Sequence, residues 1–121
     1  MQQIVLFLKL VRASPWAELE IGTGSGYPVA VLAQLVKQVY TIEIVPQLAQ
    51  SARRTLTRLG YSNVAVREGD GDKGWPEQAP FDRIILTAPP EVPKTLVDEL
   101  VRGGRIVAGE PGLGAANSCS R

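Results

Sequence analysis

Three glycines at alternate positions, 22, 24 and 26, directly follow a short apolar run in the stretch "AELEIGTGSGYPV". Glycine tolerates positive φ and carries no Cβ, so such a cluster marks backbone that turns sharply or lies close against a ligand. After the glycines, apolar residues recur at the spacing of one helix face, at Val29, Leu32, Ala33 and Val36. The stretch therefore predicts a strand over residues 17–21, a glycine-rich turn and a helix over 26–36.

The same alternation continues along the chain. Residues 38–44 are β-branched and aromatic and predict a second strand, and Pro46 suits the first turn of the helix that follows. That helix is expected to end at Gly60. Its inward residues are expected to be Leu48, Ala52, Leu56 and Leu59.

Three further strands are predicted over residues 63–67, 81–88 and 103–109. A helix centred on Leu96, Val97 and Leu100 precedes the last of them. Strands that alternate with helices specify an α/β fold with right-handed crossovers between parallel strands. We therefore predict a Rossmann-like three-layer sandwich with a mainly parallel sheet of about five strands in the order 3-2-1-4-5.

The two ends of the chain differ from this pattern. The opening residues are predicted to form a helix that buries Leu6 and Leu10, and this apolar stretch is far too short to span a bilayer. Residues 1–109 are expected to form one domain, and the small, polar residues 110–121 a disordered tail. The fifth strand would then be a sheet edge that exposes Ile106 and Val107, which predicts self-association or marginal stability.

Composition narrows the functional classes. Thirteen basic and twelve acidic residues leave a formal net charge of +1, which argues against nucleic acid or an anionic membrane as a partner. The chain has no histidine, which excludes Ser-His-Asp catalysis and most zinc sites, and no metal is expected. The lone Cys119 cannot form an internal disulfide, which is typical of a cytoplasmic protein.

The glycines indicate where a ligand lies. In an open parallel sheet, ligands bind beyond the carboxyl ends of the strands, beside the first strand. The spacing here is GxGxG, with Tyr27 where a dinucleotide fingerprint has its last glycine, and no GKS or GKT follows. A pyrophosphate loop is therefore disfavoured and a Walker loop is excluded.

Acidic residues near the strand ends complete the predicted pocket. Glu43 follows the first glycine by about 20 residues, where a carboxylate accepts ribose hydroxyls. Glu20 would repel a pyrophosphate and favour a ligand with an ammonium and a sulfonium. Asp70 is placed to accept a hydrogen bond from an adenine amino group, with Gly69 and Gly71 allowing the ring to lie against the backbone. These residues predict an adenosyl ligand that carries positive charge.

At these residues the sequence resembles the class I S-adenosylmethionine-dependent methyltransferases, and more narrowly the protein-L-isoaspartate O-methyltransferase family. The resemblance covers roughly residues 17–108, and lies in the blocks "LEIGTGSGY", "VYTIE", "GDGDKGWPEQAPFDRIILTA" and "GGRIV". The family's substrate loop and later strands are not matched, so the chain is expected to be truncated at both ends relative to the family.

The resemblance implies S-adenosyl-L-methionine as cofactor, with S-adenosyl-L-homocysteine as product. It places Glu20, Gly22, Gly24 and Gly26 around the methionine part, Glu43 at the ribose, and Asp70 and Gly71 at the adenine. Thr87 and Ala88 would line the transfer site. The implied reaction is methyl transfer to the carboxylate of L-isoaspartyl or D-aspartyl residues in damaged proteins, which serves protein repair.

Two other functions remain open at this point. The chain could be a non-catalytic remnant or interaction module that keeps the cofactor fold without the substrate half. A nicotinamide-dependent oxidoreductase is a third reading, which Tyr27 argues against.

Overall fold

The computed structural model of the chain describes residues 14–22, 26–87, 91–109 and 116–120. Its elements in chain order are β1 (Ser14–Ile21), α2 (Tyr27–Ala33), β2 (Val36–Glu43), α3 (Pro46–Arg58), β3 (Val64–Glu68), the 3-10 turn η1 (Gly71–Lys73), β4 (Phe81–Thr87), α4 (Lys94–Asp98), β5 (Leu100–Gly109) and β6 (Ala116–Ser120).

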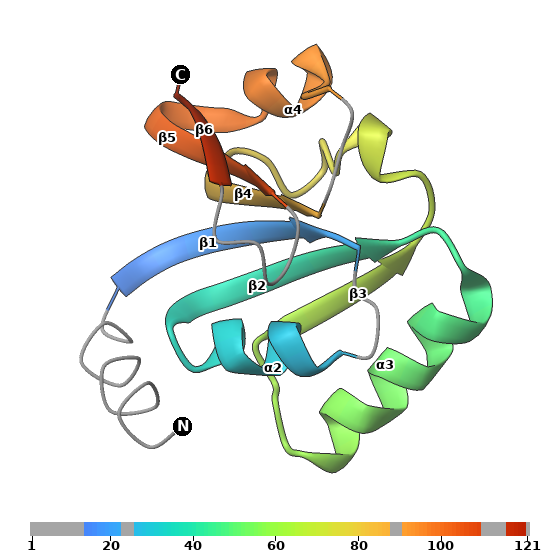
Figure 1. Ribbon diagram of the computed structural model, residues 1–121. Coiled ribbons are helices and arrows are strands. Elements are labelled where there is room, and N and C mark those ends of the chain that lie inside the picture. Colours follow the sequence, from blue (N-terminus) through green and yellow to red (C-terminus); the bar gives the residue numbers. More distant parts are fainter. Residues whose placement is uncertain (1–13, 23–25, 88–90, 110–115, 121) are drawn as a thin grey trace.

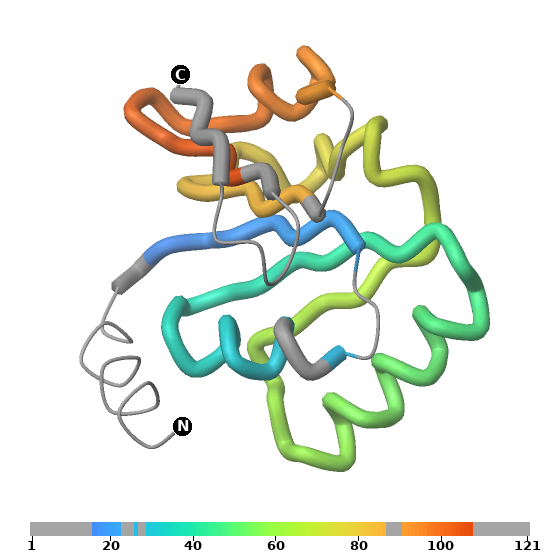
Figure 2. Tube along the Cα trace, viewed as in Figure 1, coloured from blue at the N-terminus to red at the C-terminus, as the bar shows by residue number. Residues whose placement is uncertain are grey.

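The strands form one sheet in the order β3-β2-β1-β4-β5-β6. The first five strands are parallel to their neighbours, and β6 runs antiparallel to β5. In Figure 1, α2 and α3 lie on one side of the sheet and α4 on the other, which gives three layers. The crossovers between strands can be followed in Figure 2. The predicted α/β architecture and the order 3-2-1-4-5 are confirmed.

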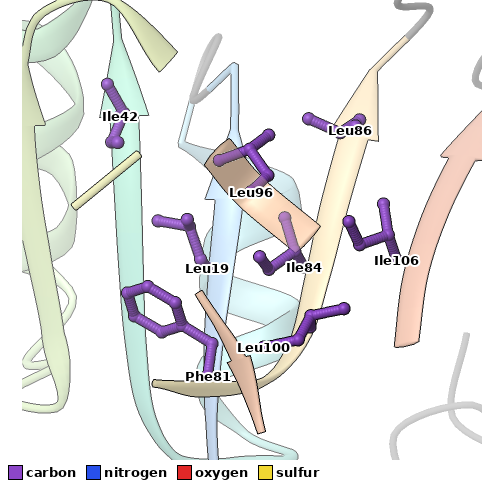
Figure 3. Close-up of a cluster of buried hydrophobic side chains, with 8 residues drawn as sticks. All are labelled: Leu19, Ile42, Phe81, Ile84, Leu86, Leu96, Leu100 and Ile106. Atoms are coloured by element: carbon purple, nitrogen blue, oxygen red, sulfur yellow. The ribbon is translucent and has the colours of Figure 1, made fainter. Parts of the chain in front are cut away.

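The alternation of side chains along β1 divides the sheet into two different faces. Leu19 is fully buried on the face covered by α4, in a cluster of large apolar side chains drawn in Figure 3. The members of this cluster are Leu19, Ile42, Phe81, Ile84, Leu86, Leu96, Leu100 and Ile106. Glu18 and Glu20 point to the opposite face because successive residues of a strand alternate, and both are buried.

A second apolar cluster lies between α2 and the sheet. Its buried members are Val29, Ala30, Ala33, Val36, Val39 and Leu56. Val29 and Ala33 are buried as the helical spacing predicts, and Leu32 is half-buried. The helix is shorter than predicted, however, because it ends at Ala33 and Val36 already belongs to β2.

The limits of α3 and the burial of Ala52 and Leu56 are as predicted, but the rest of its buried face is not. Pro46 stands in the first turn, and Gly60 follows the helix with φ of +83°. The buried residues are Ala49, Ala52 and Leu56, which follow one another at intervals of three and four. Leu48 and Leu59 lie beside this stripe and are 41% and 55% exposed, so their predicted burial is wrong. Alanine takes the inner positions because small side chains let the helix approach the sheet closely.

The segment before β5 also differs from the prediction. The helix α4 ends at Asp98, and Leu100 is the first residue of β5, where it pairs with Phe81. The register then shifts, so that Arg83 pairs with Arg105. The intervening residues bulge out of the ladder, and Gly103 provides the left-handed conformation there, with φ of +83°.

The tail contributes a strand instead of being wholly disordered. Residues Ala116–Ser120 pair with β5 from Gly109 to Arg105, so the prediction of a disordered tail is wrong for this segment. Consequently β5 is not an edge strand, Ile106 is fully buried and Val107 is half-buried. The physical basis for the predicted self-association is therefore removed. A strand pairs through its backbone, which a sequence of small polar residues does not reveal.

The predicted opening helix with Leu6 and Leu10 lies outside the described residues. Residues 14–16 belong to β1, and β6 continues the sheet beyond residue 109, which was the expected end of the domain. Among the residues that the structure describes, no helix has the length and apolar character needed to cross a membrane.

Candidate functional site

The carboxyl ends of β1, β2 and β4 meet at one edge of the sheet, since these strands are parallel. Two backbone hydrogen bonds hold the following loops close to β2. The N–H of Gly22 donates to the carbonyl of Ile42 over 2.8 Å, and the N–H of Gly69 donates to the carbonyl of Glu43 over 2.9 Å. The loops after β1 and β3 therefore flank the end of β2, at the edge where open α/β sheets bind ligands.

The glycine loop turns as the sequence predicts. Gly22 and Gly26 have φ of +98° and +86°, a conformation that L side chains rarely adopt. Gly26 also begins α2, and its carbonyl accepts the N–H of Ala30. A Cβ at Gly26 would lie 3.4 Å from Ala52 Cβ on α3, which is ordinary contact. The backbone conformation, and not crowding, is what requires glycine at position 26. Gly24 lies outside the described residues.

Glu20 lies in β1 directly before this loop and is 4% exposed. Burial, and then the neighbouring Glu18, raise the pKa of Glu20 from 4.5 to about 7. A carboxyl in such a place gains from a cationic partner, because the partner stabilises the charged form that burial disfavours. The predicted affinity of this position for a cation has a physical basis in the structure.

Glu18 is the second buried carboxyl of β1, and sequence reasoning missed it. Its Oε1 lies 3.4 Å from Arg83 Nη1, while its Oε2 has no hydrogen-bond partner within the described ranges. Burial raises the pKa of Glu18, and Arg83 acts in the opposite direction. The alternation of glutamate and leucine in "ELE" could have shown that both acids share one face of the strand.

Glu43 ends β2 and is 6% exposed. Its Oε2 accepts the N–H of Val45 over 3.1 Å, which fixes the carboxylate at the carboxyl end of the strand and at the entry to α3. A carboxylate has two oxygens with several lone pairs, so it can accept more than one hydrogen bond. The position is compatible with the predicted contact to a ribose.

Asp70 and Gly71 lie in the loop after β3. Asp70 caps η1, where its Oδ1 accepts the N–H of Asp72 over 2.9 Å, and the residue is exposed. Gly71 is buried against the end of β1, and a Cβ added there would overlap Ile21 Cγ2. Glycine is therefore needed at position 71, and it brings Asp70 beside the glycine loop.

The two residues predicted for the transfer site are only partly described. Thr87 is the last residue of β4 and pairs with Gly109. Ala88 lies outside the described residues. The end of β4 shares its edge of the sheet with Ile21 and Glu43, as parallel pairing requires.

Glu99 is a further residue that sequence reasoning missed. It follows α4, is 7% exposed, and its Oε1 accepts the N–H of Trp75 over 2.8 Å. The ring of Trp75 lies 5.4 Å from that of Tyr40, and the side chain is half-buried. The sequence feature that could have indicated the burial of Glu99 is its position between Leu96 and Leu100, because both leucines are buried.

This sheet order, with a glycine turn after β1 and acidic residues at the ends of β1 and β2, defines the class I S-adenosylmethionine-dependent methyltransferase fold. Solved structures agree. The chain matches a protein-L-isoaspartate O-methyltransferase with a TM-score of 0.76 and 34% identity, over 88% of this chain and 35% of that one. It also matches a SAM-dependent O-methyltransferase from Thermotoga maritima with a TM-score of 0.71 and 26% identity, over 88% of this chain and 42% of that one.

The chain belongs to the protein-L-isoaspartate(D-aspartate) O-methyltransferase family, whose model matches residues 2–111. The protein-L-isoaspartate O-methyltransferase of Gloeobacter violaceus is 57% identical over 98 residues, which are 79% of this chain and 48% of that protein. The enzyme of the same name from Myxococcus xanthus is 59% identical over 90 residues, 74% of this chain and 42% of that protein. The chain thus spans about half or less of the length of these relatives.

Proposed function

We propose that this chain binds S-adenosyl-L-methionine at the carboxyl edge of the sheet and directs methyl transfer to the carboxylate of L-isoaspartyl or D-aspartyl residues in damaged proteins. Family membership supports this substrate class. The observation that carries the proposal is the pair of buried carboxyls, Glu20 and Glu43, beside a left-handed glycine turn.

The methionine end of the cofactor fits the residues around the glycine loop. Its ammonium would satisfy the charge of Glu20, which burial otherwise disfavours. Gly22, Gly24 and Gly26 would surround the same part with bare backbone. A methyltransferase from Streptococcus mutans that shares this fold, with a TM-score of 0.66 and 21% identity, has been solved in complex with SAH.

The adenosyl end fits the residues of the next two strands. Glu43 would accept the ribose hydroxyls from its fixed place at the end of β2. Asp70 would accept a hydrogen bond from the adenine amino group, while Gly71 keeps the loop flat against Ile21. Both carboxylates are acceptors, so they favour the hydroxyl and amino donors of an adenosyl group and disfavour a pyrophosphate.

When bound, the cofactor supplies a methyl group made electrophilic by the sulfonium. A carboxylate substrate is already ionised at neutral pH, so the chain has no proton to remove. The role of Thr87 and Ala88 would be to line the transfer site, align the carboxylate and exclude water. The lack of histidine is compatible with this chemistry.

The partner would be a damaged protein or peptide, without nucleic acid or membrane, and the proposed location is the cytoplasm. The near-neutral net charge and the lone Cys119 support these two points. The comparisons do not favour the alternative of a non-catalytic cofactor-binding remnant.

Transfer of labelled methyl groups to an isoaspartyl peptide tests the proposal. We expect label in the isoaspartyl peptide and none in a peptide of the same sequence with ordinary aspartate. Cofactor binding without transfer would contradict the catalytic part and select the remnant. Equal labelling of both peptides would contradict the substrate class.

A further inference from the structure

We infer that Glu99 is a positioning residue that fixes the adenine-side loop and thereby sets the selectivity of the site for adenine. The inference rests on the proposed function, in which Asp70 contacts the adenine amino group. Glu99 does not touch the ligand in this proposal. It acts through the backbone of Gly74 and Trp75.

The main chain of Glu99 is held independently of its carboxyl group. The neighbouring Leu96 and Leu100 are both buried in the apolar cluster of Figure 3. The N–H of Glu99 donates to the carbonyl of Leu96 over 3.1 Å, and its own carbonyl accepts the N–H of Phe81 over 2.7 Å. The side chain therefore projects from a rigid base, as a positioning group requires.

The carboxyl group contacts the end of the adenine-side loop. Its Oε1 accepts the N–H of Trp75 over 2.8 Å. Gly74 has φ of +64°, and a Cβ there would overlap the carboxyl atoms of Glu99. The carboxyl thus lies directly on the backbone at Gly74, and the hydrogen bond to Trp75 fixes the direction in which the loop leaves this point.

The other end of the loop is fixed at β1. Gly71 is buried against Ile21, and the N–H of Gly74 donates to the carbonyl of Gly71 over 3.0 Å. Asp70 begins the turn, and its carbonyl accepts the N–H of Lys73 over 3.2 Å. One short turn is therefore held between two contacts, Ile21 on one side and Glu99 on the other. Removal of the Glu99 carboxyl leaves the turn held only at its first end, by Ile21 and by the hydrogen bond from Gly69 to Glu43, so that the turn and the Asp70 carboxylate on it are less rigidly positioned.

Other contacts at Trp75 do not replace this one. The ring lies 5.4 Å from that of Tyr40, and the Arg67 guanidinium lies 5.4 Å from its centroid. Both contacts hold the indole, and neither involves the backbone N–H, whose partner is the Glu99 carboxyl. Burial raises the pKa of Glu99 and makes its charged form costly, and the hydrogen bond from Trp75 opposes this rise. The hydrogen bond that it accepts from Trp75 explains why a carboxyl is buried at this position.

The test compares the affinities for S-adenosylhomocysteine and S-inosylhomocysteine, measured by calorimetry. The second ligand carries an oxo group in place of the adenine amino group, so Asp70 discriminates against it. We expect the wild-type chain to prefer S-adenosylhomocysteine by about 10-fold or more. In Glu99→Ala this ratio falls toward one, while Glu99→Gln keeps it because the amide oxygen still accepts from Trp75.

The matched control is Glu77→Ala, since Glu77 is an exposed carboxylate of the same segment that pairs with Arg67. It is expected to keep the wild-type ratio. A substitution that merely destabilises the fold lowers both affinities alike and leaves the ratio unchanged. If Glu99→Ala gives no cooperative thermal transition, Glu99→Asp, which is too short to reach Trp75, takes its place.

The outcomes separate the two proposals. A wild-type chain that binds neither ligand contradicts the proposed function. A wild-type chain that discriminates, together with a Glu99→Ala or Glu99→Asp variant that discriminates equally well, overturns the role of Glu99 and leaves the proposed function intact.

Discussion

The two faces of the sheet use the same strands in different ways. On β1, Leu19 enters a cluster of large apolar side chains, while Glu18 and Glu20 are buried on the opposite face. Each apolar side chain that this first face removes from water stabilises the fold. On the acidic face, the desolvation of two carboxyls destabilises the folded chain. The same two carboxyls make this position favourable for a cation. The comparison indicates that apolar clusters stabilise the fold on both faces, and that only the face with the buried carboxyls also holds the proposed site.

The largest expected effect lies on the apolar face. Leu19→Ala should lower the free energy of unfolding by about 2–5 kcal/mol, because it removes a fully buried side chain and leaves a cavity. Denaturant unfolding measures this change. Leu48→Ala is the matched control, since Leu48 is exposed on α3, and should change stability by less than about 0.5 kcal/mol. Similar losses for the two variants would show that the cluster around Leu19 contributes no more to stability than an exposed position does.

The next effect has the opposite sign and depends on pH. The pKa of Glu20 is about 7 in the folded chain against an ordinary 4.5, so the folded state holds a proton that the unfolded state releases. Stability therefore falls as pH rises from about 4.5 to about 7, and the full loss of roughly 3 kcal/mol remains above that pH. Glu20→Gln removes this loss. We expect it to stabilise the chain at pH 8 by up to about 3 kcal/mol and to have little effect at pH 4.5.

Unfolding curves for the wild-type chain and Glu20→Gln at the two pH values provide the measurement. Glu91→Gln is the control, because Glu91 is exposed. A gain in stability that is equal at both pH values would refute the role given to ionisation, and a loss at pH 8 would show that the charge of Glu20 is already compensated within the chain.

A smaller effect concerns binding at the carboxyl edge. Glu43→Ala should weaken the affinity for S-adenosylhomocysteine by about 1–3 kcal/mol, because the ribose hydroxyls lose their acceptor. Calorimetric titration gives the difference. Glu68→Ala is the matched control, since Glu68 pairs with Glu43 in the β2–β3 ladder and is exposed. Unchanged affinity in Glu43→Ala would show that Glu43 does not contact the ribose.

The smallest effect separates turn geometry from ligand contact. Gly26 and Gly60 have φ of +86° and +83°, and neither has an atom closer than ordinary contact to an added Cβ. Substitution of either by alanine should cost about 1 kcal/mol of stability through backbone strain alone. Only Gly26→Ala should also weaken ligand binding. Equal affinities in the two variants would show that the glycine turn is a folding device without contact to the cofactor.

Much of the fold could be predicted because its signals are local. The periodicity of residues 26–36, the first-turn Pro46 and the final Gly60 all depend on neighbours in sequence. They indicated both helices, although the first one ends at Ala33 and not at Val36. The burial of Leu48 and Leu59 could not be judged in the same way, because a helix of this composition has two adjacent apolar stripes. The sheet buries the one that carries Ala49 and Ala52, since small residues allow closer packing.

The candidate site likewise combines features that local sequence predicts with features that depend on residues distant in sequence. The glycine turn and the position of Glu43 follow from the order of elements along the chain. The contact of Glu99 with Trp75 joins residues from two separate loops, so no local pattern contains it. The strand β6 was missed because its pairing depends on the backbone of β5 and not on its own small, polar side chains.

Calorimetric titration with S-adenosylhomocysteine at pH 6 and pH 7.5 tests the acidic face most directly. We expect saturable binding of one ligand per chain, tighter at pH 7.5, because its ammonium favours the ionised form of Glu20. Absence of both a heat of binding and a thermal shift at either pH would contradict the assignment of this face as a cofactor site.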